Sequence, residues 1–104
     1  MKNITQAEWE AKLSEDKNAI ILDVRTADEC SYGILENAIC LDYFDTEKFL
    51  SEIQKADKNK NYYVYCRSGN RSANACRLME DSGIANTFNL IGGITGWTGK
   101  IITK

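Results

Sequence analysis

The chain has 104 residues, 43% of them hydrophobic, so it is long enough for one domain with its own core, and we treat residues 1–104 as a single domain. Its 13 basic and 15 acidic side chains give a formal net charge of −2, which argues against nucleic-acid partners. No apolar run approaches the roughly 20 residues of a membrane span. The start of the sequence lacks the apolar region of a secretory signal. We therefore expect a cytoplasmic protein with no membrane partner.

Two residue types are missing from the sequence, and the absence of one of them limits the catalytic mechanisms that the protein can use. Without histidine, catalysis by Ser-His-Asp or Cys-His groups and metal binding by imidazole are excluded. Proline is also absent. The four cysteines, at positions 30, 40, 66 and 76, form no C-x-x-C pair, which argues against a zinc site and against a disulfide framework. We expect reduced thiols, no metal and no cofactor.

Strand and helix patterns alternate along the chain. In order, they predict a helix at 6–14, a strand at 19–24, one or two helical turns at 27–32, a strand at 38–41, a helix from about 46 to 56, a strand at 62–65, a helix at 70–82, a strand at 87–91 and one turn at 94–97. Strands separated by helices imply a parallel sheet with helices on both faces, which is an α/β fold.

Several helix ends carry recognisable signals. Thr5 and Glu8 have the spacing of a capping box, and Ile4 and Trp9 flank it as a hydrophobic staple would. Asp45 is predicted to cap the helix that follows it. Gly83 suits the position that ends the helix before it.

The segment from Cys66 to Ser72, C-R-S-G-N-R-S, lies between a predicted strand and a predicted helix. Ligands of open α/β sheets bind at this carboxyl edge of the strands. Backbone N–H groups of such a turn can form an anion-binding nest, and the helix N-terminus adds its positive end. Gly69 permits the tight curl, and Arg67 and Arg71 add two charges. This setting lowers a thiol pKa, so Cys66 is predicted to be a reactive thiolate.

A cysteine after a strand is often only a small buried hydrophobe. The two arginines, the glycine and the polar side chains that follow Cys66 favour the reactive role, because a core cysteine has no need of them.

The same residues resemble the active-site loop of rhodanese-like sulfurtransferases. Three further segments are similar to that family: Leu22-Asp23-Val24-Arg25 to its early strand end, residues 32–38 to its G-H-I-x-G-A segment, and Gly92-Gly93 with Gly96-Trp97 to its C-terminal element. The resemblance covers about the whole chain. It implies a three-layer fold with a central five-stranded parallel sheet between helices.

The resemblance also implies a reaction. The Cys66 thiolate takes a sulfane sulfur from an anionic donor such as thiosulfate, becomes a persulfide, and passes the sulfur to cyanide or a thiol. The implied substrate-binding residues are those of the loop: Arg67, Ser68, Gly69, Asn70, Arg71 and Ser72. A sulfur-relay protein with a protein acceptor and a catalytically idle interaction module are the alternatives. The intact Cys66 argues against the idle module.

The spacing from Cys66 to Arg71 separates related families. Four residues separate Cys66 from Arg71, and this spacing resembles that of the sulfur-transferring members. The related phosphatases and arsenate reductases have a similar loop that is one residue longer. Those relatives also commonly have a histidine where this chain has Tyr65. Two departures from the family pattern concern packing more than chemistry. Ile34 stands in place of a histidine, and Asn37 in place of a glycine.

The remaining candidates have simpler explanations. Cys76 shares a helix face with apolar residues, so we expect a core thiol rather than a resolving cysteine, and Cys40 is also expected in the core. Cys30 is expected to be partly exposed, with an unperturbed pKa. Asp23 and Arg25 are expected to form a structural ion pair or a helix cap. Three aromatic residues complete the set: Tyr43 and Phe44, which either wall the substrate mouth or belong to the core and rim, and Trp97, which is expected to pack on the sheet.

Overall fold

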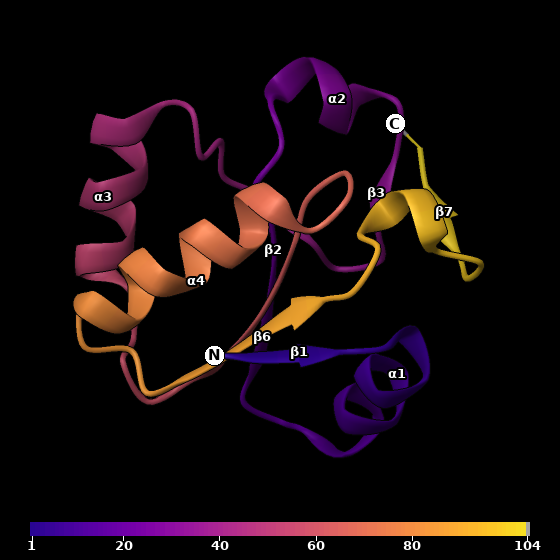
Figure 1. Ribbon diagram of the computed structural model, residues 1–104, viewed down its shortest axis with the longest axis horizontal. Helices are drawn as coiled ribbons and strands as arrows, with labels where there is room; N and C mark the ends of the chain where they lie inside the picture. The colour runs from indigo at the N-terminus through magenta and orange to yellow at the C-terminus, as the bar shows by residue number, and fades with distance from the viewer. Residues whose placement is uncertain (104) are drawn as a thin grey trace.

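The computed structural model describes residues 1–103, and Figure 1 follows them from the N-terminus to the C-terminal end. Its elements are β1 (Lys2–Ile4), α1 (Gln6–Glu15), β2 (Ala19–Asp23), α2 (Ala27–Ser31), β3 (Ile34–Leu35), β4 (Ile39–Cys40), α3 (Thr46–Lys55), β5 (Asn61–Tyr65), α4 (Asn70–Asp81), β6 (Asn86–Leu90), the 3₁₀ turn η1 (Ile94–Gly96) and β7 (Ile101–Ile102).

Five strands form one parallel sheet in the order β1-β6-β5-β2-β4, so the predicted five-stranded α/β fold is confirmed. Four of these strands were predicted. The other one, β1, was not, because three residues are too few to show a periodicity. It pairs with β6, from the opposite end of the chain. A separate antiparallel pair, β3 and β7, lies beside this sheet and was also not predicted.

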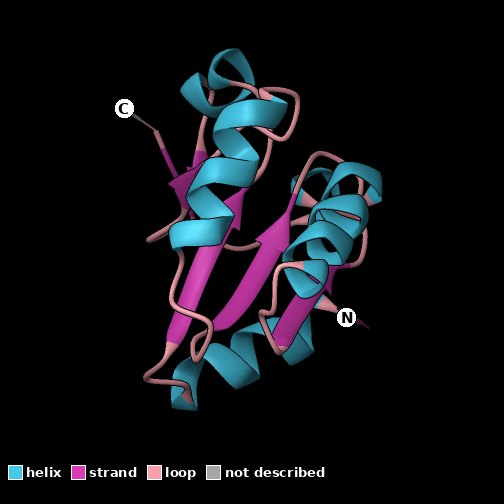
Figure 2. Ribbon diagram, turned by 90° about the vertical axis from the view of Figure 1, so that its left-hand side faces the viewer, coloured by secondary structure: helices cyan, strands magenta, loops and turns pink. Residues whose placement is uncertain are grey.

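Two hydrophobic clusters cover the two faces of the sheet, and Figure 2 shows the strands running between helices. β5 contributes to both, because successive side chains of a strand point to opposite faces. Tyr62 and Val64 pack with α3 and α4, whereas Tyr63 and Tyr65 pack with Trp9 of α1. The middle strand β5 is therefore covered on both faces, and Cys66 follows it at the carboxyl edge of the sheet.

The helix ends agree with the sequence in two cases out of three. The capping box of Thr5 and Glu8 is present, and Gly83 follows α4 with a positive φ of 100°. Asp45 occupies the predicted cap position of α3, but its side chain makes no capping hydrogen bond. Instead, Asp45 supports the helix only through its backbone carbonyl, which accepts from Phe49 N.

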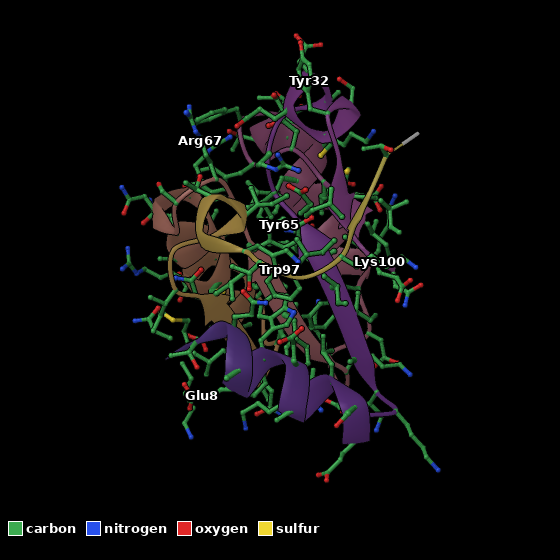
Figure 3. All side chains as sticks on the ribbon, turned by 90° about the vertical axis from the view of Figure 1, so that its right-hand side faces the viewer. Glu8, Tyr32, Tyr65, Arg67, Trp97 and Lys100 are labelled. Carbon is green, nitrogen blue, oxygen red and sulfur yellow. The ribbon has the colours of Figure 1, made fainter. Side chains whose placement is uncertain are left out.

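Trp97 packs against the cluster on the α1 face, as predicted, and Figure 3 shows it close to Tyr65. Cys40 is not in the core, so that prediction is wrong. It lies on β4, an edge strand of the parallel sheet, where both residues of the strand are exposed. Within residues 1–103, no helix has the length and apolar character needed to cross a membrane.

Candidate active site

The Cys66 loop leaves the carboxyl end of the central strand β5 and enters α4 (Figure 1). Cys66 is 1% exposed. Gly69 takes a φ of 116° at the cap position of α4, a conformation that glycine adopts without steric cost. No side chain caps this helix. Its first backbone N–H groups are therefore left for the sulfur, or for an anion bound beside it.

The sulfur of Cys66 accepts hydrogen bonds from two groups of the loop. The backbone N–H of Gly69 lies 3.1 Å from Sγ, and the hydroxyl of Ser72 lies 3.3 Å from it. Burial alone would raise the pKa of Cys66. The Ser72 hydroxyl and the backbone N–H groups of Ser72, Gly69 and Ser68 outweigh it, and the pKa of this thiol is lowered. The site therefore stabilises the thiolate form of Cys66 relative to an ordinary cysteine.

The turn η1 holds the opposite side of the loop. The N–H of Ile94 donates to Cys66 O at 3.0 Å, and the N–H of Thr95 donates to Arg67 O at 3.1 Å. Each of these carbonyls shares a planar peptide unit with the N–H of the next residue. Turning the carbonyls toward η1 therefore turns the N–H groups of residues 67 and 68 toward the inside of the loop.

Asn89 on β6 is a contributor that the sequence did not single out. Its Oδ1 lies 2.5 Å from the Ser72 hydroxyl oxygen and shares the single proton of that hydroxyl with the Cys66 sulfur, and its Nδ2 donates to Gly69 O at 3.2 Å and to Asn3 Oδ1 at 2.9 Å. Asn89 is 5% exposed. This buried amide therefore contacts both residues that bind the Cys66 sulfur, and it connects β1 and β6 to the loop.

The two arginines of the loop have different surroundings. Arg71 makes a two-pronged ion pair with Glu29 of α2, at 2.7 and 2.9 Å, and its guanidinium lies 5.2 Å from the centre of the Phe44 ring. Arg71 lowers the pKa of Glu29 to about 2. Its charge was expected to lower the pKa of Cys66 and to help bind an anionic donor, but Glu29 neutralises much of it. Hydrogen bonds are therefore the main cause of the thiol's acidity.

Arg67 is exposed, and within residues 1–103 it forms no ion pair. Figure 3 shows it at the edge of the molecule, pointing outward. Ser68 and Asn70 are also exposed at the mouth of the loop. Among the predicted loop residues, Gly69 and Ser72 thus contact the Cys66 sulfur, whereas Arg67 is a cation open to solvent.

Phe44 and Tyr43 have different positions. Tyr43 is half-buried and packs edge-on against Phe49 of α3, with ring centres 5.6 Å apart, so it belongs to the core. Phe44 is 63% exposed and lies beside Arg71 at the mouth. Phe44 therefore forms part of the rim of the site.

Asp23 and Arg25 form the predicted structural ion pair at the end of β2. The Arg25 guanidinium donates to both carboxylate oxygens, the shortest contact being 2.6 Å, and also to Gly33 O at 2.7 Å. Both residues are buried, so the pair joins β2 to the segment after α2. In that segment Ile34 is buried, and Asn37 takes a φ of 67°, the left-handed conformation that a glycine adopts more easily.

The other cysteines differ in their surroundings. Cys76 lies fully buried, as predicted, and burial raises its pKa to about 12. The expectation of an unperturbed pKa for Cys30 is wrong. Partial burial and the neighbouring thiol of Cys40 raise it well above the ordinary value. The sequence could not show this contact, because the two cysteines lie ten residues apart on different elements.

Comparison with known proteins places this chain in a family. A sequence model of the Rhodanese-like domain matches residues 6–100. The chain is 31% identical to the protein YtwF of Bacillus subtilis, with 100% of this chain and 97% of that protein covered. It is 33% identical to a protein of Allochromatium vinosum named as a sulfurtransferase, with 83% of this chain and 78% of that protein covered.

Among solved structures, the rhodanese-like domain protein of Staphylococcus aureus superposes with a TM-score of 0.84 at 35% identity, covering 100% of this chain and 99% of that one. Some relatives are longer proteins with other names. A tRNA uridine(34) hydroxylase of Pelagibacter ubique is 28% identical, but 34% of its length is covered. Fold, order of elements and family match agree, and the chain belongs to the rhodanese-like domain family.

Proposed function

We propose that this protein is a sulfurtransferase that carries a sulfane sulfur on Cys66 and acts in the cytoplasm, where thiols stay reduced. One observation carries the proposal. The sulfur of Cys66 accepts hydrogen bonds from Gly69 N and from the Ser72 hydroxyl, and its pKa is lowered although the residue is 1% exposed. A buried thiol that nevertheless favours its thiolate is poised as a nucleophile.

The proposed first step uses thiosulfate or a similar anionic donor. The Cys66 thiolate attacks the sulfane sulfur, a new S–S bond forms, the donor's S–S bond breaks, and sulfite leaves with the bonding electron pair. The product is a Cys66 persulfide anion, which the N–H groups around the old thiolate can also stabilise. In the second step a thiol or cyanide attacks the outer sulfur, and Cys66 leaves as the thiolate. No external oxidant or reductant is consumed.

We propose that the negatively charged donor binds at the mouth of the loop. Arg67 provides the cation that no described residue neutralises, and the N-terminus of α4 provides uncapped N–H groups. Ser68 and Asn70 add polar groups beside them. We assign donor binding to these four features, and the positioning of Gly69 and Ser72 to the contacts with Asn89.

The test is mass spectrometry of the intact protein after incubation with thiosulfate. The expected product gains one sulfur atom, located on Cys66 by peptide mapping, and cyanide removes it as thiocyanate. Cys66→Ser should gain no sulfur, whereas the control Cys76→Ser should gain it normally. A persulfide that a small thiol or cyanide fails to discharge would indicate a relay with a protein acceptor. No mass gain in the wild type would disprove the proposal.

A further inference from the structure

Two cysteines outside the Cys66 loop meet at the edge of the sheet. Cys30 comes from α2 and Cys40 from β4, and the carboxylate of Asp23, at the end of β2, lies with them. The two sulfurs and a carboxylate oxygen lie within 4.8 Å of one another. The parallel register pairs Asp23 directly with Cys40, which explains how β4 reaches this cluster. Three elements therefore bring two thiols together that the sequence separates by ten residues.

The carboxylate of Asp23 is already engaged. Arg25 donates its Nε to Asp23 Oδ1 at 2.9 Å and a terminal nitrogen to Oδ2 at 2.6 Å, and the backbone N–H of Arg25 donates to Oδ1 at 3.0 Å. These bonds hold Asp23 at the border of the cluster. The two thiols are the groups left free to bind a ligand.

The two sulfurs lie within 4.8 Å of each other, which is close to the distance that one bridging metal ion spans. Two metal–sulfur bonds of about 2.3 Å span at most about 4.6 Å. Zinc in structural sites takes four ligands, and this cluster offers two thiols and an occupied carboxylate. Thiolate ligands select soft ions such as monovalent copper, which is satisfied by two sulfur ligands.

We propose that Cys30 and Cys40 form a two-thiolate site for a monovalent copper ion at the junction of α2 and β4. Binding exchanges the two thiol protons for one ion. Two S–H bonds break, two copper–sulfur bonds form, two protons go to solvent, and no oxidation state changes. Cys40 is exposed and provides the entry from solvent, whereas Cys30 is half-buried.

Copper bound at this site would hold α2 against the sheet. Helix α2 has five residues, none of which is buried, so few packing contacts hold it. It also carries Glu29, which pairs with Arg71 of the Cys66 loop. A copper ion between Cys30 and Cys40 would attach α2 to the sheet at a residue next to Glu29. The site is separate from Cys66, so the inference does not depend on the proposed sulfur transfer.

The experiment uses the full chain with Cys66→Ser, so that the reactive thiol cannot bind the probe. Monovalent copper is titrated without oxygen against a chromophoric copper chelator. One ion per chain is expected, with two sulfur ligands in the copper-edge X-ray absorption spectrum. Adding Cys30→Ser or Cys40→Ser should weaken binding by at least about 100-fold, because losing even a supporting partner of a ligand costs about 10–100-fold. Adding Cys76→Ala, the matched control, should leave the affinity unchanged.

Thermal unfolding verifies that each variant is folded, and the exposed position of Cys40 makes Cys40→Ser the safer of the two ligand variants. Three results would overturn the proposal. One is unchanged copper affinity in the Cys40→Ser protein. Another is equally tight binding of zinc. The third is a protein that forms a Cys30–Cys40 disulfide with hydrogen peroxide but binds no copper when reduced, which would mark the pair as a redox dithiol.

Discussion

The carbonyl oxygen of Cys66 lies only 2.5 Å from the point that a Cβ atom on Gly93 would occupy, and the carbonyl oxygen of Arg67 lies equally close. Gly93 also takes a positive φ of 56°. The backbone after β6 therefore packs directly on the backbone of the Cys66 loop. This contact lets η1 reach the two carbonyls and so orients the N–H groups of the loop.

Gly93→Ala should therefore push the Cys66 loop out of place. We expect kcat/KM for thiosulfate and cyanide to fall at least about 100-fold, since a displacement of about 1 Å at a reacting group costs that much. Gly92→Ala is the matched control, because Gly92 also has a positive φ, of 81°, but nothing lies within 4 Å of its added Cβ. It should lose about 1 kcal/mol of stability through backbone strain while keeping most of its activity. Equal activity losses would contradict the packing argument.

Removing the Ser72 hydroxyl should make the Cys66 thiol less acidic. A hydrogen bond to a charged group is worth about 1.5–3 kcal/mol, which corresponds to a pKa rise of about one to two units in Ser72→Ala. At pH values below the pKa of the wild-type thiol, iodoacetamide should then label Cys66 at least about tenfold more slowly, and the difference should shrink as the pH rises.

Peptide mapping of the adducts between pH 5 and 9 measures this profile. The conservative variant Ser72→Thr keeps a hydroxyl and serves as the control, and Cys76, whose pKa is raised to about 12, is the internal reference. Sulfite should slow the labelling of wild-type Cys66 by occupying the loop. A profile that is the same in Ser72→Ala and wild type would show that the backbone N–H groups suffice.

Arg67→Ala should reduce the use of anionic donors more than that of neutral ones. Arg67 has an exposed charge with no ion-pair partner among residues 1–103, and in water such a charge is worth about 1 kcal/mol at 4 Å, or about fivefold. Comparing kcat/KM for thiosulfate with that for a neutral persulfide donor measures the difference. Arg67→Lys retains the charge and should behave like wild type. Added salt should shrink the effect.

Arg71→Ala is expected to act differently from Arg67→Ala, because Glu29 already balances the charge of Arg71. The kcat/KM of Arg71→Ala should fall to a similar extent for thiosulfate and for the neutral donor, because the contact between α2 and the loop is lost. A selective loss for thiosulfate in Arg71→Ala would show instead that this arginine binds the donor.

The Glu29–Arg71 pair should make the free energy of unfolding depend on pH in the acidic range. The pKa of Glu29 falls from 4.5 to about 2 on folding, so the folded protein binds this proton less readily than the unfolded chain. The stabilisation is complete above about pH 4.5 and is lost as the pH falls toward 2. Because the pair is partly exposed, we expect about 1 kcal/mol. Urea unfolding at pH 7 and pH 3 should show a smaller difference between the two pH values for Glu29→Gln than for wild type.

The sequence by itself determined the parallel sheet and the nature of the loop. The largely apolar runs at 19–24 and 62–65 are typical of strands whose side chains are buried on both faces of a parallel sheet. Cys66, Gly69 and the start of the next helix are contiguous in the chain, so a nest for the sulfur follows from local geometry alone. Helix ends at Thr5 and Gly83 are readable for the same reason, since their signals lie within a few residues.

Only the tertiary structure decided the features that depend on distant segments. β1 is too short to be recognised, and pairing with β6 is what makes it a strand. Arg71 could not be known to face Glu29, 42 residues away, rather than the sulfur. Cys40 has apolar neighbours in sequence, yet its strand lies at the edge of the sheet, where solvent and Cys30 reach it. Periodicity reports which face of an element is apolar, but strand order decides which elements are covered.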